Sequence, residues 1–261
     1  MADADKSAEL GAELGAALIT GAGRRIGRAI ALALSRAGYA VALHANRSRA
    51  EAEQLAGEIA GSGGRASVVL GDLADPAAVG GLVAAAAVFS PLTLLVNNAG
   101  VFEHDDIETL ERARFERAFA VNLAAPLFLT QAFAAQAADG ADASVVNVLD
   151  QRVFRPGPRF LSYGLSKSAL HTATVTLAQA LAPKLRVNAV APGPTLPSSR
   201  QTKEQFAEQA AKVPLGRGPT PEEVAAAVVY LAQAKSVTGI TIAVDGGQHL
   251  DWRTPDNDVA E

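Results

Sequence analysis

AALITGAGRRIGRAIALALSRAG, residues 16–38, is the stretch that decides the fold. The apolar run 16–20 predicts a short buried strand, GAGRRIG predicts a tight turn, and the following apolar spacing predicts a helix that ends at Gly38. A glycine turn that opens a helix directly after a strand aims backbone N–H groups and the positive end of the helix at an anion. In this context the turn predicts a dinucleotide-binding site.

The same alternation of strand and helix patterns continues along the chain. Further strands are predicted at 39–44, 66–70, 92–97, 144–149, 186–191 and 239–244, and helices at 48–60, 76–88, 107–138 (two helices), 161–182, 204–212 and 221–231. Repeated strand–helix units require a parallel sheet with right-handed crossovers, because tight hairpins cannot join parallel strands. We predict a single doubly wound, Rossmann-like α/β domain of about seven parallel strands, with helices on both faces.

Length and composition fit one domain. The chain has 261 residues, of which 49% are hydrophobic, and an α/β domain of this size buries a large core. We expect a frayed N-terminal segment at 1–14, the Rossmann domain at 15–252 with a substrate loop near 193–214, and a tail at 253–261.

The charge pattern argues against polymeric partners. A net charge of −4 without a basic stripe gives no footprint for nucleic acid, and no polybasic anchor for a membrane. The acidic start is no signal peptide, and we expect no apolar run long enough to span a membrane, so a cytoplasmic protein is predicted. The absence of cysteine excludes disulfides and thiol catalysis, and the four scattered histidines predict no metal site.

The end of the second predicted strand selects the dinucleotide. Sites for NAD usually place Asp or Glu there to hold the ribose 2′-hydroxyl, whereas this strand runs into His44, Ala45, Asn46, Arg47 and Ser48. A guanidinium and a hydroxyl suit a 2′-phosphate, so NADPH is favoured over NADH. The alternative for Arg47 is an ordinary charge at a helix entry.

Two residues near this site have a role that the pattern leaves open. Arg25, in the glycine turn, could add a second cation at the phosphate. Asp72 follows the third predicted strand and could accept a hydrogen bond from the adenine amino group, or else cap the helix that begins at Pro76.

A second group of residues points to acid–base chemistry. Tyr163 and Lys167 are four residues apart on a predicted helix, so they share a face, and the ammonium is expected to lower the pKa of the phenol. Asp150 lies thirteen residues before Tyr163. The Tyr-x-x-x-Lys spacing alone is a weak signal, because a solvated helix face shows it as well.

Taken together these motifs resemble the short-chain dehydrogenase/reductase family over nearly the whole chain. The glycine turn, the run Asn97-Asn98-Ala99-Gly100, Asn122, the Tyr163/Lys167 pair and Pro192-Gly193 occur in the family's order and spacing. The resemblance implies that Tyr163 is the proton donor, that Lys167 lowers its pKa and holds the nicotinamide ribose, that Asn122 anchors a water leading to the lysine, and that Asn97 braces the central strands.

The cofactor contacts that this reading implies are spread over six segments. They are Gly21, Arg24, Arg25, Ile26, His44, Asn46, Arg47, Ser48, Asp72, Leu73, Asn98, Ala99, Gly100, Tyr163, Lys167, Pro192, Gly193 and Thr195. Thr195 would contact the nicotinamide amide and begins a segment, 195–202, in the position of a mobile lid.

Two departures from the family pattern occur together in its pteridine reductase branch, which this sequence resembles more closely. Most members of the family have a Ser where this chain has Asp150, and a third turn glycine where it has Arg25. In that branch an aromatic residue stacks the pterin against the nicotinamide, and Phe102 is at the matching position of this sequence. Arg25, Phe102, Asp150 and Tyr163 are therefore the predicted substrate contacts.

The chemistry of Asp150 is reasonable apart from the resemblance. Hydride transfer to a C=N bond leaves a nitrogen that needs a proton, and a carboxyl group linked to Tyr163 can relay one. Asp150 could instead be a simple hydrogen-bond acceptor in a loop, and Phe102 could belong to the core. Arg152, Arg155 and Arg159 could attract an anionic tail or could simply be solvated.

The sequence thus predicts an NADPH-dependent reductase of a pterin C=N bond. The alternative is a carbonyl reductase or alcohol dehydrogenase of the same fold, and a third hypothesis is an NADPH sensor without turnover. The family resemblance also implies a homotetramer built through helices at 114–138 and 161–182, although alanine-rich helices also pack inside monomers.

Overall fold

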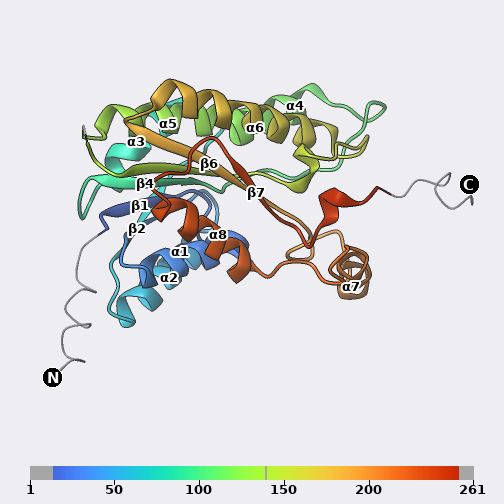
Figure 1. The fold of residues 1–261 in the computed structure, drawn as a ribbon, viewed down its shortest axis with the longest axis horizontal. Coiled ribbons are helices and arrows are strands. Elements are labelled where there is room, and N and C mark those ends of the chain that lie inside the picture. The colour runs from blue at the N-terminus through green and yellow to red at the C-terminus, as the bar shows by residue number, and fades with distance from the viewer. Residues whose placement is uncertain (1–13, 139, 253–261) are drawn as a thin grey trace, which may run out of the picture.

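The computed structural model describes residues 14–138 and 140–252, and these form one seven-stranded parallel sheet. The strand order is β3-β2-β1-β4-β5-β6-β7, with the order reversing beside β1 (Figure 1). The strands are β1 (Ala16–Ile19), β2 (Ala40–Ala45), β3 (Ala66–Leu70), β4 (Leu92–Asn97), β5 (Ala143–Val148), β6 (Leu185–Pro192) and β7 (Thr241–Val244). The predicted doubly wound fold is confirmed.

Helices cover both faces of the sheet, as the apolar composition of the strands requires. The helices are α1 (Arg25–Arg36), α2 (Arg49–Gly61), α3 (Pro76–Ala86), α4 (Arg112–Phe119), α5 (Ala125–Gln136), α6 (Leu161–Leu181), α7 (Lys203–Ala211) and α8 (Pro221–Gln233). Every residue of β1, β2 and β5 is buried, which is typical of parallel strands covered on both sides. In Figure 1, α3, α5 and α6 lie above the sheet and α1, α2 and α8 lie below it.

The core is divided by the sheet into two apolar layers. One joins α1, α2 and α8 to the sheet through side chains such as Ile30 and Val228. The other joins α3, α5 and α6 to the opposite face, with Leu129 and Phe133 fully buried. Alternate residues of one strand serve opposite layers, so Leu18 faces the second layer and its neighbours the first. The sheet is thereby fixed as a rigid support for the loops beyond its strand ends.

The segment predicted as two helices over 107–138 differs from its prediction. Helix α4 begins only at Arg112, after a turn in which the Asp106 carboxylate accepts the N–H groups of Glu108 and Thr109. It then continues without a break through a π-helical turn, Ala120–Ala124, into α5. An Asx turn of this kind competes with helix formation, which explains the late start.

The continuous helix Arg112–Gln136 also corrects the expectation that the chain has no apolar run of membrane-spanning length. Its 25 residues contain an 18-residue stretch of mean hydropathy 1.5, of which 44% is buried inside the structure. The polar residues of this stretch are uncharged, so they do not interrupt it. A core helix packed on a sheet passes the same test of length and composition.

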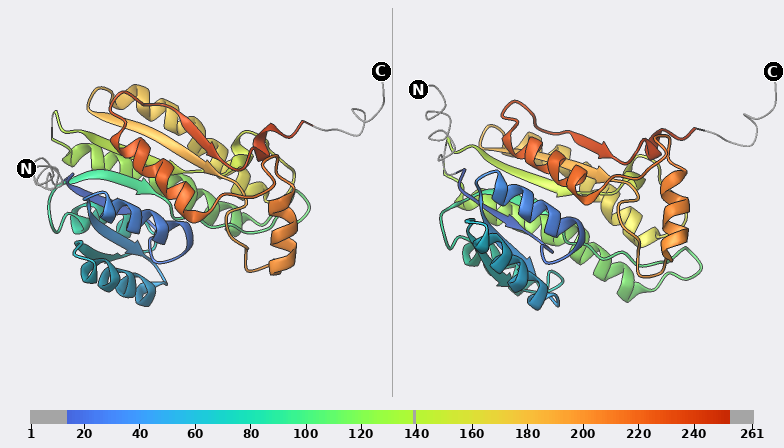
Figure 2. Two further views of the ribbon diagram at one scale, coloured as in Figure 1. Left: turned by 60° about the horizontal axis from the view of Figure 1, so that its bottom comes forward. Right: turned by 90° about the horizontal axis from the view of Figure 1, so that it is seen from below.

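One element stands apart from the two layers. Figure 2 shows α7 at one end of the molecule, beyond the carboxyl ends of the strands. It begins with a capping box, in which Thr202 and Gln205 each accept a hydrogen bond from the other's backbone N–H. The segment 193–202 leads from β6 to this helix. The predicted segment 1–14, apart from Leu14, and the tail 253–261 lie outside the described residues.

Candidate active site

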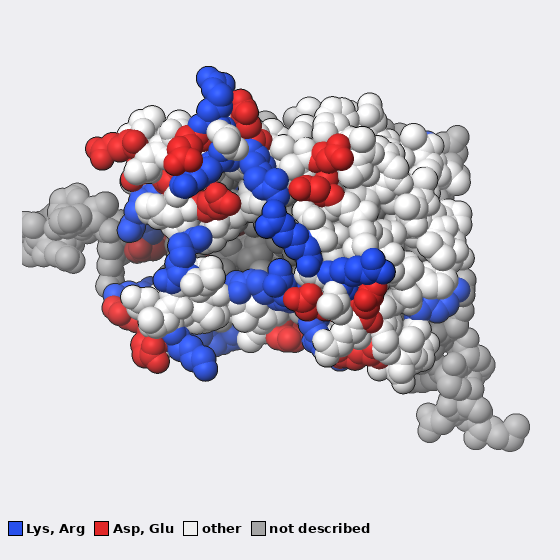
Figure 3. Space-filling model, turned by 180° about the vertical axis from the view of Figure 1, so that it is seen from behind, with Lys and Arg blue, Asp and Glu red and all other residues white. Residues whose placement is uncertain are grey.

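A cavity of about 1090 Å³ lies beyond the carboxyl ends of the strands, where the strand order reverses. Seven arginines and one lysine line it against three acidic residues, although the whole chain carries a net charge of −4. Figure 3 shows Lys and Arg side chains gathered around a hollow on this face. The cavity therefore suits an anionic ligand.

All but one of the predicted site residues line this cavity. The predicted residues on its wall are Gly21, Arg24, Arg25, Ile26, His44, Asn46, Arg47, Ser48, Asp72, Leu73, Asn98, Ala99, Gly100, Phe102, Asp150, Tyr163, Lys167, Pro192, Gly193 and Thr195. Asn122 is fully buried behind the wall.

The glycine turn is held open by side chains from neighbouring strands. Gly21 has a φ of +64°, and a Cβ on Gly27 would lie 2.2 Å from the Gly21 carbonyl oxygen, so only glycine fits there. The Asn98 side chain donates to the carbonyl oxygens of Thr20 (2.8 Å) and Gly21 (3.1 Å). The turn therefore presents its main chain to the cavity at the start of α1, which suits a pyrophosphate.

His44 supports the turn from the protein side. Its Nδ1 accepts the Gly21 N–H at 3.2 Å and its Nε2 lies 3.1 Å from the Gly71 carbonyl oxygen. Burial lowers the pKa of this imidazole, which is consistent with a neutral ring that uses one nitrogen as acceptor and the other as donor. His44 was predicted to contact the cofactor; it lines the cavity, and both its ring nitrogens are already bonded within the protein.

The far end of the cavity combines exposed cations with one acidic residue. Arg47 is exposed directly after β2, and Ser48 follows it at the entry of α2, as a 2′-phosphate site requires. Arg24 forms an ion pair of 3.5 Å with Glu51.

Asp72 is held in a local turn at this end. Its carboxylate accepts the Ala74 N–H at 2.9 Å and lies 3.7 Å from Arg117; the backbone bond and then Arg117 keep its pKa below the usual value. The alternative role for Asp72, the cap of the helix at Pro76, is wrong. Asp75 caps that helix by accepting the Ala77 N–H.

At the opposite end the predicted acid and carboxylate meet. The Tyr163 hydroxyl lies 3.0 Å from Asp150 Oδ2 and donates to it, while Oδ1 of the same carboxylate accepts the Arg152 N–H at 2.9 Å. The Asp150 side chain is 17% exposed, so it meets both solvent and the buried phenol. Asp150 therefore accepts a hydrogen bond within its own loop, which was the alternative prediction, and it also bonds to Tyr163.

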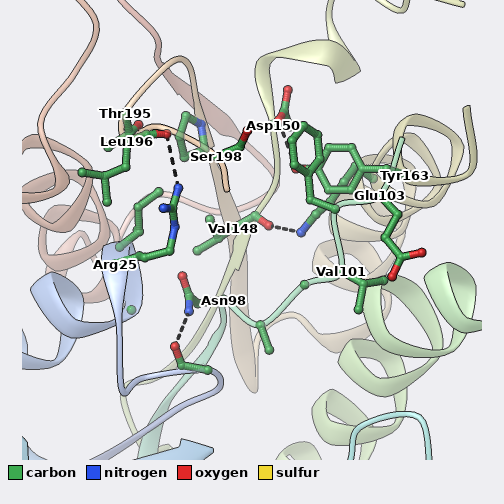
Figure 4. Close-up of a pocket in the computed structure, with 18 of the residues that line it drawn as sticks. Arg25, Asn98, Val101, Glu103, Val148, Asp150, Tyr163, Thr195, Leu196 and Ser198 are labelled. Carbon is green, nitrogen blue, oxygen red and sulfur yellow. Dashed lines mark hydrogen bonds between the residues drawn. The ribbon is translucent and has the colours of Figure 1, made fainter. Parts of the chain in front are cut away.

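Lys167 is placed differently from the expectation. Its ammonium donates to the Val148 carbonyl oxygen at 2.6 Å (Figure 4). The pKa of Tyr163 is raised well above its usual value, first by burial and then by Asp150, while burial lowers the pKa of Lys167 to about 8. The expectation that Lys167 lowers the phenol pKa is thus wrong for this state, because burial and the Asp150 carboxylate raise that pKa. The phenol is held protonated.

Asn122 sits in the π-helical turn and joins three segments. Its Oδ1 accepts the Val101 N–H at 2.9 Å, and its Nδ2 donates to the Val101 carbonyl oxygen and to Ser166 Oγ. These bonds use both hydrogens of Nδ2, and the water expected at Asn122 stays a prediction. Asn97 donates to Asn147 Oδ1 at 2.9 Å across β4 and β5, as expected for a strand brace.

An aromatic platform, Phe102 with Phe160, forms the wall beside Tyr163. The two rings are parallel with centroids 4.4 Å apart, and Tyr163 meets Phe102 edge-on at 4.7 Å. The guanidinium groups of Arg152 and Arg200 each lie within 6 Å of both rings. Phe102 is therefore a wall residue and not core.

Sequence reasoning gave no specific role to Phe160 or Arg200. Phe160 has a φ of +60°, which is rare for a bulky residue and leaves no mark in the sequence. Arg200 comes from the segment 193–202, far from Phe102 in the chain. Arg152, Arg155 and Arg159 were each predicted either to attract an anionic tail or to be solvated. Arg152 and Arg159 line the cavity, whereas Arg155 pairs with Asp251 at 2.6 Å.

The segment 193–202 closes the cavity from above. Arg25 points from the glycine turn to this segment and donates to the carbonyl oxygens of Pro197 (2.8 Å) and Leu196 (3.2 Å), as Figure 4 shows for Leu196. Arg200 donates from it to the Phe102 carbonyl oxygen at 3.1 Å. Arg25, predicted to contact substrate and cofactor, thus lines the cavity but binds this segment.

Comparison with known proteins gives consistent relatives. Residues 21–249 match the family model described as enoyl-(acyl carrier protein) reductase. The crystal structure of FolM alternative dihydrofolate reductase 1 from Brucella canis, complexed with NADP, is 49% identical with a TM-score of 0.89, covering 94% of this chain and 96% of that one. The Brucella suis protein of the same name, also with NADP, is 50% identical with a TM-score of 0.90, covering 92% and 97%.

A relative with another substrate is also similar. L-xylulose reductase from Mesocricetus auratus is 35% identical over 247 residues, which cover 92% of this chain and 98% of that protein.

Proposed function

The chain belongs to the short-chain dehydrogenase/reductase family, and on that premise we propose that it is an NADPH-dependent reductase of a C=N bond in a reduced pterin. The observation that carries the proposal is the 3.0 Å hydrogen bond between Tyr163 and Asp150 beside the Phe102/Phe160 platform. The similarity to two proteins named alternative dihydrofolate reductase, at about half identity, supports the same substrate class.

The residues present fit NADPH. The glycine turn and the start of α1 would hold the pyrophosphate, and Arg47 with Ser48 would hold the 2′-phosphate. Tyr163 and Lys167 would contact the nicotinamide ribose, and Thr195, whose hydroxyl donates to the Gly193 carbonyl oxygen, would lie at the nicotinamide amide. The bound cofactor supplies the hydride that adds to the carbon of the C=N bond.

The protein's own task is to protonate the nitrogen. Burial and the neighbouring carboxylate keep the Tyr163 phenol protonated, so it can give its proton as negative charge develops on the substrate nitrogen. The phenolate left behind regains a proton through Asp150, which bonds to it and reaches solvent. A serine in place of Asp150 could orient the substrate but would be a much weaker acid at this point.

The flat platform gives the substrate its orientation. Phe102 offers an aromatic face next to the Tyr163 hydroxyl, and Arg152 and Arg200 favour an electron-rich or anionic ligand there. A small aliphatic ketone would leave this face uncovered. The similarity to L-xylulose reductase nevertheless makes a carbonyl substrate the second candidate.

NADPH oxidation with dihydrobiopterin or dihydromonapterin, compared with a panel of simple ketones, tests the proposal. Wild type should turn over the pterins, and Asp150→Ser should lose roughly 100-fold in kcat, within the range that general acid catalysis contributes. Turnover of ketones alone, with Asp150→Ser as active as wild type, would overturn the pterin assignment and leave a carbonyl reductase.

We also propose that the protein assembles as a homotetramer through α5 and α6. These helices expose Phe128 (58%), Leu165 (48%) and Val175 (41%). Apolar side chains of this size favour contact with another protein surface. Light scattering coupled to size-exclusion chromatography should give four times the monomer mass, and a monomer peak would contradict the proposal.

A further inference from the structure

The start of α6, the helix that carries Tyr163, lacks a cap of its own. The residue before it, Phe160, has left-handed backbone angles (φ 60°, ψ 46°) and no side chain that could accept a hydrogen bond. The first N–H groups of a helix have no partner within it and need one from elsewhere when they are buried.

Asp105 supplies that partner from a distant part of the chain. Its backbone carbonyl oxygen accepts the N–H groups of Phe160 (2.7 Å) and Leu161 (3.3 Å). Its carboxylate accepts the N–H of Ser162, at 3.2 and 3.3 Å for its two oxygens, and also a short hydrogen bond from the Ser162 hydroxyl. Three successive N–H groups at the helix start therefore end on one residue.

The carboxylate is almost fully enclosed. Asp105 is 2% exposed and Ser162 is 4% exposed. A buried carboxylate is costly unless hydrogen bonds and positive charge compensate it, and the positive end of a helix provides both. Here the Ser162 N–H and hydroxyl, at the start of α6, supply those hydrogen bonds.

Asp105 connects the aromatic platform to Tyr163. It follows Phe102 by three residues on the segment after β4, and Ser162, which it holds, directly precedes Tyr163. It also fixes the N–H of Phe160, whose ring stacks on Phe102. The aromatic platform and the Tyr163 phenol are thus tied to each other through this single side chain and its backbone.

We propose that Asp105 is a positioning residue of the active site, which caps α6 from the Phe102 segment and so sets the Tyr163 hydroxyl against the substrate plane. It contacts neither substrate nor cofactor and acts through Ser162 and Phe160. The proposal rests on Tyr163 being the proton donor but not on the substrate being a pterin. It is therefore tested with whichever substrate, pterin or ketone, wild type turns over.

Asp105→Asn keeps the shape of the side chain and removes its charge, and it replaces one acceptor oxygen by a donor. We expect kcat to fall roughly 100-fold, since a misplacement near 1 Å costs about this much, while the Kd for NADPH stays within twofold of wild type. Ser162→Ala removes only the hydroxyl bond and keeps the Ser162 N–H, so it should lower kcat about tenfold.

Asp106→Asn is the matched control. Within residues 14–138 and 140–252, this neighbouring carboxylate accepts hydrogen bonds only from Glu108 and Thr109 in its own turn, so the kcat of Asp106→Asn should remain within twofold of wild type. Thermal unfolding of every variant separates stability from positioning. Rates are measured at least 20 °C below the lowest midpoint, a margin of roughly five times or more the shift of about 2–4 °C that 1 kcal/mol causes in a protein of this size.

A purely structural Asp105 would lower the unfolding midpoint of Asp105→Asn and leave kcat and KM of the folded enzyme unchanged, and that result overturns the proposal. If Asp105→Asn does not fold, Ser162→Ala decides in its place, and a kcat equal to that of wild type again overturns it. Failure of the pterin assay alone would show as ketone turnover by wild type, which leaves this comparison intact.

Discussion

The two ends of the cavity are held together by different means. At the glycine-turn end the turn that begins at Gly21 and the exposed side chain of Arg47 line the cavity. At the Tyr163 end the functional groups are buried and bonded within the protein: Tyr163, 9% exposed, bonds to Asp150, and Lys167, 3% exposed, bonds to the Val148 carbonyl oxygen. An exposed cation acts largely alone in high dielectric, whereas a buried group changes the protonation and position of its neighbours. Substitutions at the two ends should therefore differ in size and in what they disturb.

The largest effect should come from Tyr163→Phe. The change removes the proton donor and leaves the ring to pack against Phe102, so kcat should fall roughly 1000-fold or more while NADPH binding persists. Single-turnover kinetics and a fluorescence titration of NADPH measure the two quantities. A variant as active as wild type would remove Tyr163 from the chemistry, and a wild type without any turnover would favour the sensor hypothesis.

Gly27→Ala tests how well the glycine-turn end of the cavity tolerates a substitution at a buried position. Gly27 is buried, and its new methyl group would meet the Gly21 carbonyl oxygen at 2.2 Å and Asn98 Nδ2 at 2.6 Å. The turn would have to move, so we expect NADPH to bind roughly 100-fold more weakly, with kcat at saturation changed much less.

Gly57→Ala provides the matched control for this substitution. Gly57 lies exposed within α2, and in the described part of the chain no atom beyond its own stretch of helix would come within 4 Å of the added methyl group. Alanine is the better helix former, so this variant should gain about 0.5–1 kcal/mol of stability and bind NADPH as wild type does. Equal NADPH affinity in both variants would show that the turn is more compliant than its contacts indicate.

The lowered pKa of Lys167 predicts how activity and stability depend on pH at the Tyr163 end. Its folded pKa of about 8 lies below the usual 10.5, so kcat/KM should fall about tenfold per pH unit above pH 8 as the ammonium loses its proton. The native state then holds fewer protons than the unfolded state between about pH 8 and 10.5. The free energy of unfolding should therefore rise with pH in that window, by at most about 1.4 kcal/mol per unit from this group.

Urea unfolding of wild type and Lys167→Met between pH 7 and 10 isolates that contribution. Wild type should gain stability relative to the variant only above pH 8, because below it both states of Lys167 are protonated. A constant difference across the whole range would mean that burial does not lower the pKa of Lys167.

The sequence predicted the glycine-turn end better than the Tyr163 end for a physical reason. A phosphate site of this type depends on local chain features, namely a strand, a glycine turn and the residues that follow the next strand, and each of these is continuous in sequence. The sheet follows from the same local patterns. The late start of α4 was missed because the Asp106 turn outweighs the helical spacing.

The Tyr163 end depends on contacts between segments that are far apart. Asp150, Tyr163 and Lys167 were found by their spacing, but the pKa of the phenol is raised first by burial and then by the Asp150 carboxylate, and spacing gives neither. Asp105 bonds to residues more than 50 positions away, and no local pattern marks it. The left-handed Phe160 is equally silent in the sequence, since its conformation is stabilised by that distant partner.

Of the substitutions Tyr163→Phe, Gly27→Ala, Lys167→Met and Arg47→Ala, the last should have the smallest effect. It tests the exposed, glycine-turn end of the cavity. Loss of a guanidinium from a 2′-phosphate site should raise the KM for NADPH roughly tenfold and leave that for NADH nearly unchanged, so the preference between them narrows. The difference should shrink further in high salt, because exposed charges are screened. Arg49→Ala is the control, since Arg49 pairs with Glu53 at 2.7 Å on α2, and its KM values should match wild type. A fall in kcat for Arg47→Ala at saturating NADPH would contradict this difference between the two ends of the cavity. It would mean that an exposed cation at the glycine-turn end governs proton transfer at the Tyr163 end.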